Sequence, residues 1–173
     1  MKRRIIIISI SLFVILAGLI TGGSIRQRNV IKILENSTPE LILPRLYQKK
    51  YPQVKVLKKA IRHHDETLRM KAAYALGETR DKGAVHALIH ALADFNPGVQ
   101  RAAGNALEKI GESAVPALKR VMKNVGPGDN GERVAAILVS LEGADIADFM
   151  MHCARRRNQY TRAYAAMALG MLK

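Results

Sequence analysis

Residues 69–77 read RMKAAYALG, and residues 162–170 carry the close copy RAYAAMALG. The two copies begin 93 residues apart, which is three steps of 31. Related segments lie between them at the same steps: VQRAAGNAL at residues 99–107 and NGERVAAIL at residues 130–138 align with residues 68–76 and 161–169. Self-similarity at a fixed period of tens of residues is typical of stacked repeat proteins. The sequence therefore predicts an array of repeated units.

A shorter apolar motif alternates with the first one. It recurs at residues 54–61, 85–92, 115–122 and 146–153, in steps of 31, 30 and 31 residues. Its apolar residues lie three or four positions apart, which is the spacing of an amphipathic helix. We therefore expect an all-α fold. It would be an α-solenoid of helix pairs, with about four units of about 31 residues, over residues 52–173.

A small residue occupies the same position in every second helix, at Ala73, Gly104, Ala135 and Ala166. Small side chains let neighbouring helices approach closely, whereas a larger one would overpack the contact at a cost of about 1–3 kcal/mol. Because the spacing is equal in four copies, these residues indicate helix packing in addition to the helix propensity of alanine.

The expected helix ends also recur. Asp65 and Asn96 stand where second helices should begin, and both are preferred N-cap residues. Pro97 follows at the first helical position, where its missing N–H costs no hydrogen bond. Gly77 and Gly111 stand where these helices should end, so we expect both to be C-caps.

These motifs resemble a known repeat family. Residues 68–81, 84–92 and 99–111 carry the pattern (V/L)-R-x-x-A-A-x-A-L-G followed by D-x-x-A-V-x-A-L-x-x-A-L. The pattern is similar to the short HEAT-like repeats named after phycobilisome lyases. Three of the four units match it well, and the copy at residues 130–141 lacks the glycine. The resemblance implies a curved α-solenoid that presents a surface to a protein partner.

The first 25 residues predict one transmembrane helix ahead of the array. Residues 5–25 carry no charge, and twelve of the sixteen residues from 5 to 20 are Ile, Leu, Phe or Val. A helix of this length spans about 32 Å, close to the roughly 30 Å hydrocarbon core of a bilayer. We expect an uncleaved anchor at residues 1–25. A cleaved secretory signal is the alternative, with residues 21–24 (TGGS) as its small-residue exit.

Basic residues flank this segment on both sides. Residues 2–4 (KRR) precede it, and three basic residues follow it within residues 26–32. The positive-inside rule therefore gives a near tie. The compact KRR, together with the chain's amino group, favours an N-terminus inside. The repeat domain would then lie on the outer, periplasmic or extracytoplasmic, side.

Residues 26–51 form a basic connector between the anchor and the array. Residues 26–64 hold ten basic groups against two acidic ones, in a chain with 28 Lys and Arg against 14 Asp and Glu. Ser37 and Glu40 have capping-box spacing and predict the start of a short helix, which we expect Pro44 to limit. Such a helix would cap the open N-terminal face of the array.

Two basic clusters are candidate interaction surfaces: Lys55, Lys58, Lys59 and Arg62 in the first unit, and Arg155, Arg156 and Arg157 in the last. Near a membrane, the first cluster would attract anionic lipid by about 1 kcal/mol per residue. The second cluster suits an acidic protein partner. Aromatic residues make up only 5% of the chain and offer little base stacking, which argues against a nucleic acid partner.

No catalytic motif accompanies the repeats. Residues 69–77 also resemble deoxyhypusine hydroxylase, a HEAT-like repeat enzyme that has iron-binding His and Glu where this chain has Met70 and Lys71. His86 and His90 are four residues apart, a spacing that can bind zinc or copper, but no Glu completes an H-E-x-x-H motif. We therefore expect no catalytic residue and no cofactor, with this histidine pair as a weak metal candidate.

Together these features predict a non-catalytic, membrane-tethered scaffold that mediates protein–protein interaction. The alternative is a lyase-like or metal-binding enzyme subunit built on the same repeats. Phycobilin lyases share the repeat, but no residue of this sequence identifies a bilin site. The single cysteine, Cys153, has apolar neighbours in the sequence, so we expect a buried thiol.

Overall fold

The computed structural model describes residues 28–48, 53–127 and 130–172. These residues form helices joined by turns, with no β-strand among them, so the expected all-α class is confirmed. Within the three ranges, no helix is long and apolar enough to cross a lipid bilayer. The predicted membrane segment at residues 1–25 lies outside the described residues.

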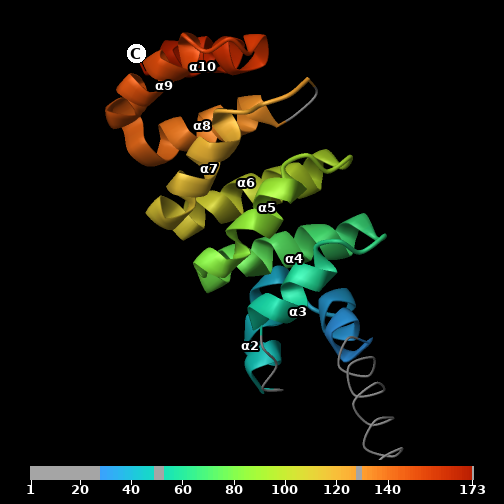
Figure 1. Cartoon of the computed structure of the whole chain (residues 1–173). Coiled ribbons are helices and arrows are strands. Elements are labelled where there is room, and N and C mark those ends of the chain that lie inside the picture. Colours follow the sequence, from blue (N-terminus) through green and yellow to red (C-terminus); the bar gives the residue numbers. More distant parts are fainter. Residues whose placement is uncertain (1–27, 49–52, 128–129, 173) are drawn as a thin grey trace, which may run out of the picture.

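Successive helices form pairs that stack along the molecule (Figure 1). The pairs in the described ranges are α3 (Gln53–Ala60) with α4 (Glu66–Thr79), α5 (Val85–Ala91) with α6 (Pro97–Ile110), α7 (Val115–Met122) with α8 (Gly131–Glu142), and α9 (Ala147–Ala154) with α10 (Gln159–Met171). Short 3-10 turns link the pairs: η1 (Lys82–Ala84), η2 (Gly111–Ala114) and η3 (Gly143–Ile146). The second helices of neighbouring pairs lie side by side, most closely α4 and α6. This arrangement is that of an α-solenoid.

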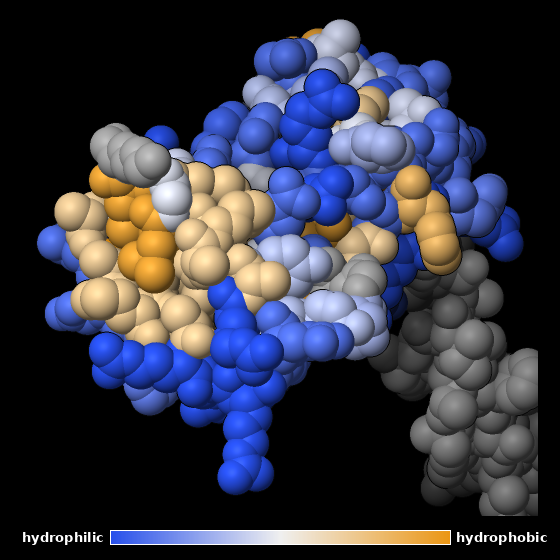
Figure 2. All heavy atoms as spheres, turned by 90° about the horizontal axis from the view of Figure 1, so that it is seen from above, coloured by the Kyte–Doolittle hydropathy of each residue, from blue (hydrophilic) through white to orange (hydrophobic). Residues whose placement is uncertain are grey.

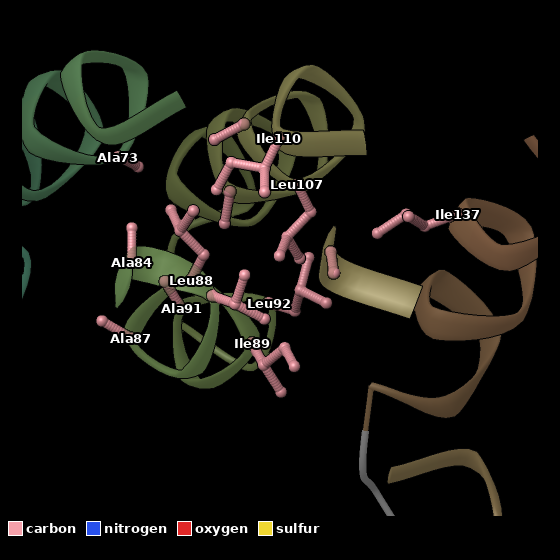
Figure 3. Packing of buried hydrophobic residues seen from close by; sticks show 14 of the residues in the cluster. Ala73, Ala84, Ala87, Leu88, Ile89, Ala91, Leu92, Leu107, Ile110 and Ile137 are labelled. Carbon is pink, nitrogen blue, oxygen red and sulfur yellow. The ribbon is translucent and has the colours of Figure 1, made fainter. Parts of the chain in front are cut away.

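Large apolar residues close each pair, and they recur at the repeat spacing. The equivalent positions at the C-terminal end of the first helix, or directly after it, are at most 4% exposed: Ile61, Leu92, Met122 and Cys153. In Figure 3, Leu88 of α5 and Leu92, which directly follows α5, lie against Leu107 of α6. Burial of each such side chain stabilises the fold by about 1.5–3 kcal/mol. The expected buried thiol is confirmed, and desolvation raises the pKa of Cys153.

Three second helices of the described chain begin with the same side-chain cap. Asp65 Oδ1 accepts hydrogen bonds from the N–H groups of Thr67 and Leu68, at 2.7 and 3.2 Å. Asn96 and Asn158 make the equivalent pairs of bonds at the starts of α6 and α10. Such a cap satisfies N–H groups that have no partner within the helix and stabilises it by about 1 kcal/mol. The predicted caps at Asp65 and Asn96 are therefore confirmed.

The arginine that opens both copies of the motif closes the turn in front of its own helix. Arg69 Nη1 donates to the carbonyl oxygens of His63 and His64, at 3.0 and 2.8 Å. Arg162 Nη1 makes the equivalent bonds to the two carbonyl oxygens in the turn before α10, at 3.2 and 2.8 Å. The repeated arginine therefore provides hydrogen-bond partners for two carbonyl groups of the turn.

Arg69 also joins two neighbouring pairs. Its Nε and Nη2 atoms donate to the two carboxylate oxygens of Asp94, at 2.7 and 2.8 Å, in the bidentate geometry that makes such pairs strong. The side chains are only 15% and 13% exposed. The hydrogen bond from Arg69 holds the pKa of Asp94 below its ordinary value. Asp94 also accepts the N–H of Asn96 at 2.9 Å, so the turn before α6 is fixed to α4.

Gly77 does not end its helix, and the prediction of a C-cap there is wrong. α4 continues to Thr79, and Arg80 closes it with a φ of 50°. Gly77 lies instead where α4 touches α6: a Cβ at this position would stand 2.7 Å from the Cα of Ala106 and 2.8 Å from its Cβ. Glycine here permits the close approach of two helices. Gly111 does end α6, with a φ of 73°, as expected.

The small residues at the repeated packing position do not all have the same surroundings. Ala73 and Ala135 are fully buried. Gly104 is half-buried, and a Cβ there would lie 3.8 Å from Ile137 and 3.9 Å from Leu92, which is ordinary contact distance. Ala166 is exposed on α10. The packing interpretation therefore holds for the inner helices and leaves the outer face of α10 uncovered in the described chain.

The third pair departs from the pattern at the start of α8. α8 begins at Gly131, the residue aligned with Arg69, and so starts three residues later in the pattern than α4 does. Asn130 precedes it without a side-chain cap. Its amide instead donates to the carbonyl oxygen of Ile89 at 2.9 Å, and the residue is 9% exposed. Gly131 leaves room for Tyr164, because a Cβ there would lie 2.4 Å from the tyrosine ring.

Two short helices cover one side of the first pair. They are formed by residues 28–35 and by α2 (Pro39–Gln48), and their buried side chains join the core of the repeats: Val30, Leu34, Ile42 and Leu46. Lys71 of α4 donates to the carbonyl oxygens of Leu34 and Glu35, at 2.8 and 3.2 Å. A cation at the end of a helix is stabilising because it offsets the helix dipole.

Pro44 lies inside α2 and does not limit it, contrary to expectation. The proline removes one helical hydrogen bond, which usually costs about 3 kcal/mol. Ile42 and Leu46 on either side are fully buried, and their burial offsets this cost. α2 begins at Pro39, so Thr38 and not Ser37 directly precedes it; the Ser37 hydroxyl accepts a hydrogen bond from Arg45 Nη1 at 2.8 Å.

Candidate functional site

A hollow of about 420 Å³ lies between α4 and α6. Apolar side chains form much of its lining, including Met70, Tyr74 and Ala102. Three cationic residues also line it: Lys71, Arg101 and Lys109. An apolar lining with a few polar groups is the usual composition of a binding site.

A second hollow of about 370 Å³ lies between α6 and α8. Arg101 and Asn105 line both hollows, so the two adjoin along α6. Arg133 of α8 lines the second hollow, together with Glu108. We call the two hollows together the second-helix groove, since α4, α6 and α8 form it.

Two of the groove cations already have partners within the chain. Lys109 forms an ion pair with Glu78, and its Nζ lies 4.7 Å from the centroid of the Tyr74 ring. The bond to Glu78 raises the pKa of Lys109. Lys71 is held by the carbonyl oxygens at the end of the helix formed by residues 28–35. These two lysines therefore fix the walls of the groove.

Arg101 and Arg133 differ from the lysines because both are exposed and line the hollow between α6 and α8. Within residues 28–48, 53–127 and 130–172, neither guanidinium group has an ion-pair partner. A guanidinium group can bind a carboxylate through two parallel hydrogen bonds. The groove therefore offers cationic donors to an acidic ligand.

Nothing in the sequence alone singles out these groove residues, because they look like the ordinary polar face of amphipathic helices. The available signal is their register. Met70 and Arg101 are 31 residues apart, and so are Tyr74 and Asn105. Positions related by the repeat face the same side of a solenoid, so a list of them would outline the groove.

The two predicted basic clusters lie outside the groove, since none of their residues lines either hollow. The first cluster is exposed on α3 and in the turn that follows it: Lys55, Lys58, Lys59 and Arg62. The second cluster lies in the turn between α9 and α10, where Arg155 and Arg157 are exposed and Arg156 is half-buried. Two helix pairs separate the clusters along the chain, so they are separate surfaces.

His86 and His90 are both exposed on α5. In the part of the chain that the structure describes, no group of three or more His, Cys, Asp and Glu side chains is arranged to hold a metal ion. Met70 and Lys71, where the hydroxylase has iron ligands, line the second-helix groove. Thioether and ammonium groups do not fit an iron site of His and carboxylate ligands.

Comparison with known families agrees with the stacked pairs. Residues 54–128 match the family model for HEAT repeats, which covers the helices from α3 to α7. No curated protein matches the chain. The likeness to phycobilisome lyases and the extension of the repeats through α8–α10 stay predictions. Over residues 54–128, the matched model and the stacked helix pairs agree, so this part of the chain is similar to HEAT repeats.

Proposed function

We propose that this chain is a membrane-tethered, non-catalytic scaffold whose second-helix groove binds a protein partner. The observation that carries the proposal is the pair of adjoining hollows, which run across three stacked helices and present Arg101 and Arg133 beside an apolar lining. HEAT repeats commonly present such surfaces to partner proteins. An acidic segment with apolar side chains has the chemistry that complements this groove.

Site-specific photocrosslinking in native membranes tests the groove. A crosslinker at Asn105, which lines both hollows, should give a discrete adduct. The same crosslinker at His86, which is exposed on α5, is the matched control and should not give that adduct. The double variant Arg101→Glu with Arg133→Glu should abolish the Asn105 adduct. Identical adducts from both positions would count against a partner bound in the groove.

The membrane tether rests on the uncharged apolar run at residues 5–25. We expect the chain to stay in the membrane fraction after alkaline carbonate extraction, and a chain lacking residues 1–25 to be released. Added protease should digest the repeat domain from the outer side in spheroplasts or protoplasts, whose cytoplasmic membrane is intact. Digestion only after the membrane is opened would reverse the proposed orientation.

The basic cluster on α3 would contribute to membrane contact. Its four side chains are exposed: Lys55, Lys58, Lys59 and Arg62. At about 1 kcal/mol each near an anionic surface, they would add roughly 4 kcal/mol of attraction. In nanodiscs, the three lysines of the α3 cluster should be protected from amine-modifying reagents by phosphatidylglycerol and not by phosphatidylcholine alone. Equal modification in both lipids would remove anionic lipid from the proposal.

A further inference from the structure

Helix α10 is apolar on both of its faces. Ala165 and Ala168 are fully buried against the rest of the fold, on the same side of the helix as the buried Thr161. The opposite face carries apolar residues at helical spacing of three or four positions: Ala163, Ala166, Met167, Gly170 and Met171. Of these, Met167 is half-buried and the others are exposed, with Met171 at 45%. A helix that is hydrophobic all round is normally buried all round.

The same face of α4 shows what such a surface does when it is covered. Gly77 and Ala73 of α4 are buried, and Gly77 lies directly against Ala106 of the next second helix. The aligned residues of α10 are Gly170 and Ala166, which are exposed, and no atom lies within 4 Å of a Cβ built at Gly170. α10 therefore carries an uncovered copy of the surface by which α4 receives another helix.

The repeat alone does not explain how apolar the last unit is. Met171 is aligned with polar residues in the other units: Glu78, Lys109 and Ser140. Met151 of α9 is 42% exposed and is likewise aligned with polar residues: Lys59, His90 and Arg120. Figure 2 views the molecule from the α10 end and shows a continuous apolar patch beside strongly hydrophilic side chains. Methionine is common on surfaces that bind helices, because its flexible side chain adapts to the partner.

Charge decides which kind of helix fits this face. Residues 143–172 contain four arginines and two acidic residues, Asp145 and Asp148. Arg155 and Arg157 are exposed in the turn at the N-terminal end of α10. A second copy of this chain would bring a net charge of +14 against an equal charge. A helix with an acidic polar face would instead be attracted to the positive charge of Arg155 and Arg157.

We propose that the outer face of α10 binds an amphipathic helix of another protein, with an apolar stripe on α10 and acidic residues beside Arg155 and Arg157. The bound helix takes the place that α6 takes on α4, and so extends the stack by one helix. The surface is separate from the second-helix groove, and the proposal does not depend on a partner being bound there.

The test uses the full chain in phosphatidylcholine nanodiscs and two synthetic helical peptides of about four turns. Both peptides carry leucine at positions i, i+3, i+4 and i+7. One has glutamate and the other lysine at the remaining positions, and fluorescence anisotropy measures their binding against empty nanodiscs. We expect the glutamate peptide to bind and the lysine peptide to bind at least about tenfold more weakly.

Three variants test where the peptide binds and which charges it meets. The double variant Ala166→Gln with Met171→Gln should lower the affinity for the glutamate peptide by about tenfold or more. Phe95→Gln, which removes another fully exposed apolar side chain from the turn before α6, should leave binding unchanged. Arg155→Gln with Arg157→Gln should reduce the preference for glutamate over lysine. Unchanged helix content by circular dichroism checks that each variant is folded, as expected for exposed positions.

Four results would overturn the proposal: equal binding of both peptides, no binding of either, an unchanged affinity in the Ala166→Gln, Met171→Gln variant, or equal losses in that variant and in Phe95→Gln. A dimer that the α10 variant dissociates, seen by sedimentation without peptide, would assign the face to a second copy. Binding that appears only with anionic nanodiscs would assign it to lipid. The Arg101→Glu variant should not affect the peptide, which keeps this test distinct from that of the groove.

Discussion

The alanine-rich motif allows one substitution to be made twice in nearly the same sequence with opposite expected effects. Gly77 and Gly170 both end an A-L-G triplet, in α4 and α10. A methyl group at Gly77 would stand 2.7 Å from the Cα of Ala106 and 2.8 Å from its Cβ. Carbon atoms prefer about 3.5–4.0 Å, so α4 and α6 would have to separate by about 1 Å.

The magnitude follows from two opposing effects. Replacing glycine by alanine inside a helix stabilises it by about 1 kcal/mol. Overpacking a closed contact costs about 1–3 kcal/mol, and the contact at Gly77 is with backbone, which cannot rotate away, so the cost lies towards the upper end. Gly77→Ala should therefore lower the free energy of unfolding by about 1–2 kcal/mol. At Gly170, with open space around it, only the gain remains, reduced to about 0.5 kcal/mol in the last turn.

Thermal unfolding of the full chain in a non-ionic detergent, followed by circular dichroism, measures the difference. For a chain of this size, about 2–4 °C of Tm corresponds to 1 kcal/mol. The Tm of Gly77→Ala should lie about 4–8 °C below that of Gly170→Ala, with the wild type between them. A Gly77→Ala chain as stable as Gly170→Ala, or more stable than the wild type, would refute the close approach of α4 and α6.

Three further predictions concern the turns between helices. Arg69→Ala should lower the free energy of unfolding by about 1–3 kcal/mol, because Asp94 and two carbonyl oxygens lose their hydrogen-bond donor. The control Arg62→Ala, at an exposed position, should change it by less than about 0.5 kcal/mol. Urea unfolding measures both variants. Because the folded pKa of Asp94 is lowered, its contribution to stability is present above about pH 4 and is lost as the pH falls through the folded value. The difference in stability between the wild type and Asp94→Asn should therefore shrink on acidification below about pH 4, and a difference independent of pH would contradict this assignment. Asn158→Ala should lower the free energy of unfolding by about 1 kcal/mol or slightly more, because Asn158 caps α10 and also donates to the carbonyl oxygen of Val125. Asn158→Asp keeps the cap and should restore part of this stability in the same unfolding assay.

The repeat spacing was sufficient to predict the helix pairs, because each pair depends on local patterns: apolar residues at helical spacing and Asx caps. Asp65 and Asn96 illustrate this, since a cap is made with residues only two or three positions away. Gly77 shows where local reasoning fails. A glycine near a helix end fits a C-cap, and only the approach of Ala106 from another unit explains why the helix continues past it.

The groove was harder to predict for a different physical reason. Arg101 and Arg133 are exposed polar residues on amphipathic helices, and any solvated helix face has such residues. Their importance depends on which charges already have partners, as Lys109 has in Glu78. Partners of that kind come from neighbouring repeats and depend on side-chain geometry. The sequence shows that the groove residues occupy related positions in the repeat, but it does not show which of their charges form ion pairs.

The docking of residues 28–35 on the first pair also determines how the array would be presented. That helix contributes Val30 and Leu34 to the core, and Lys71 holds its last carbonyl groups. If residues 1–25 span a membrane, only a few residues separate the membrane segment from the folded domain, which begins at residue 28. The array would then meet its partner within a thin layer next to the lipid. Lateral diffusion in the membrane plane, more than diffusion from bulk solution, would set the rate at which the array meets its target.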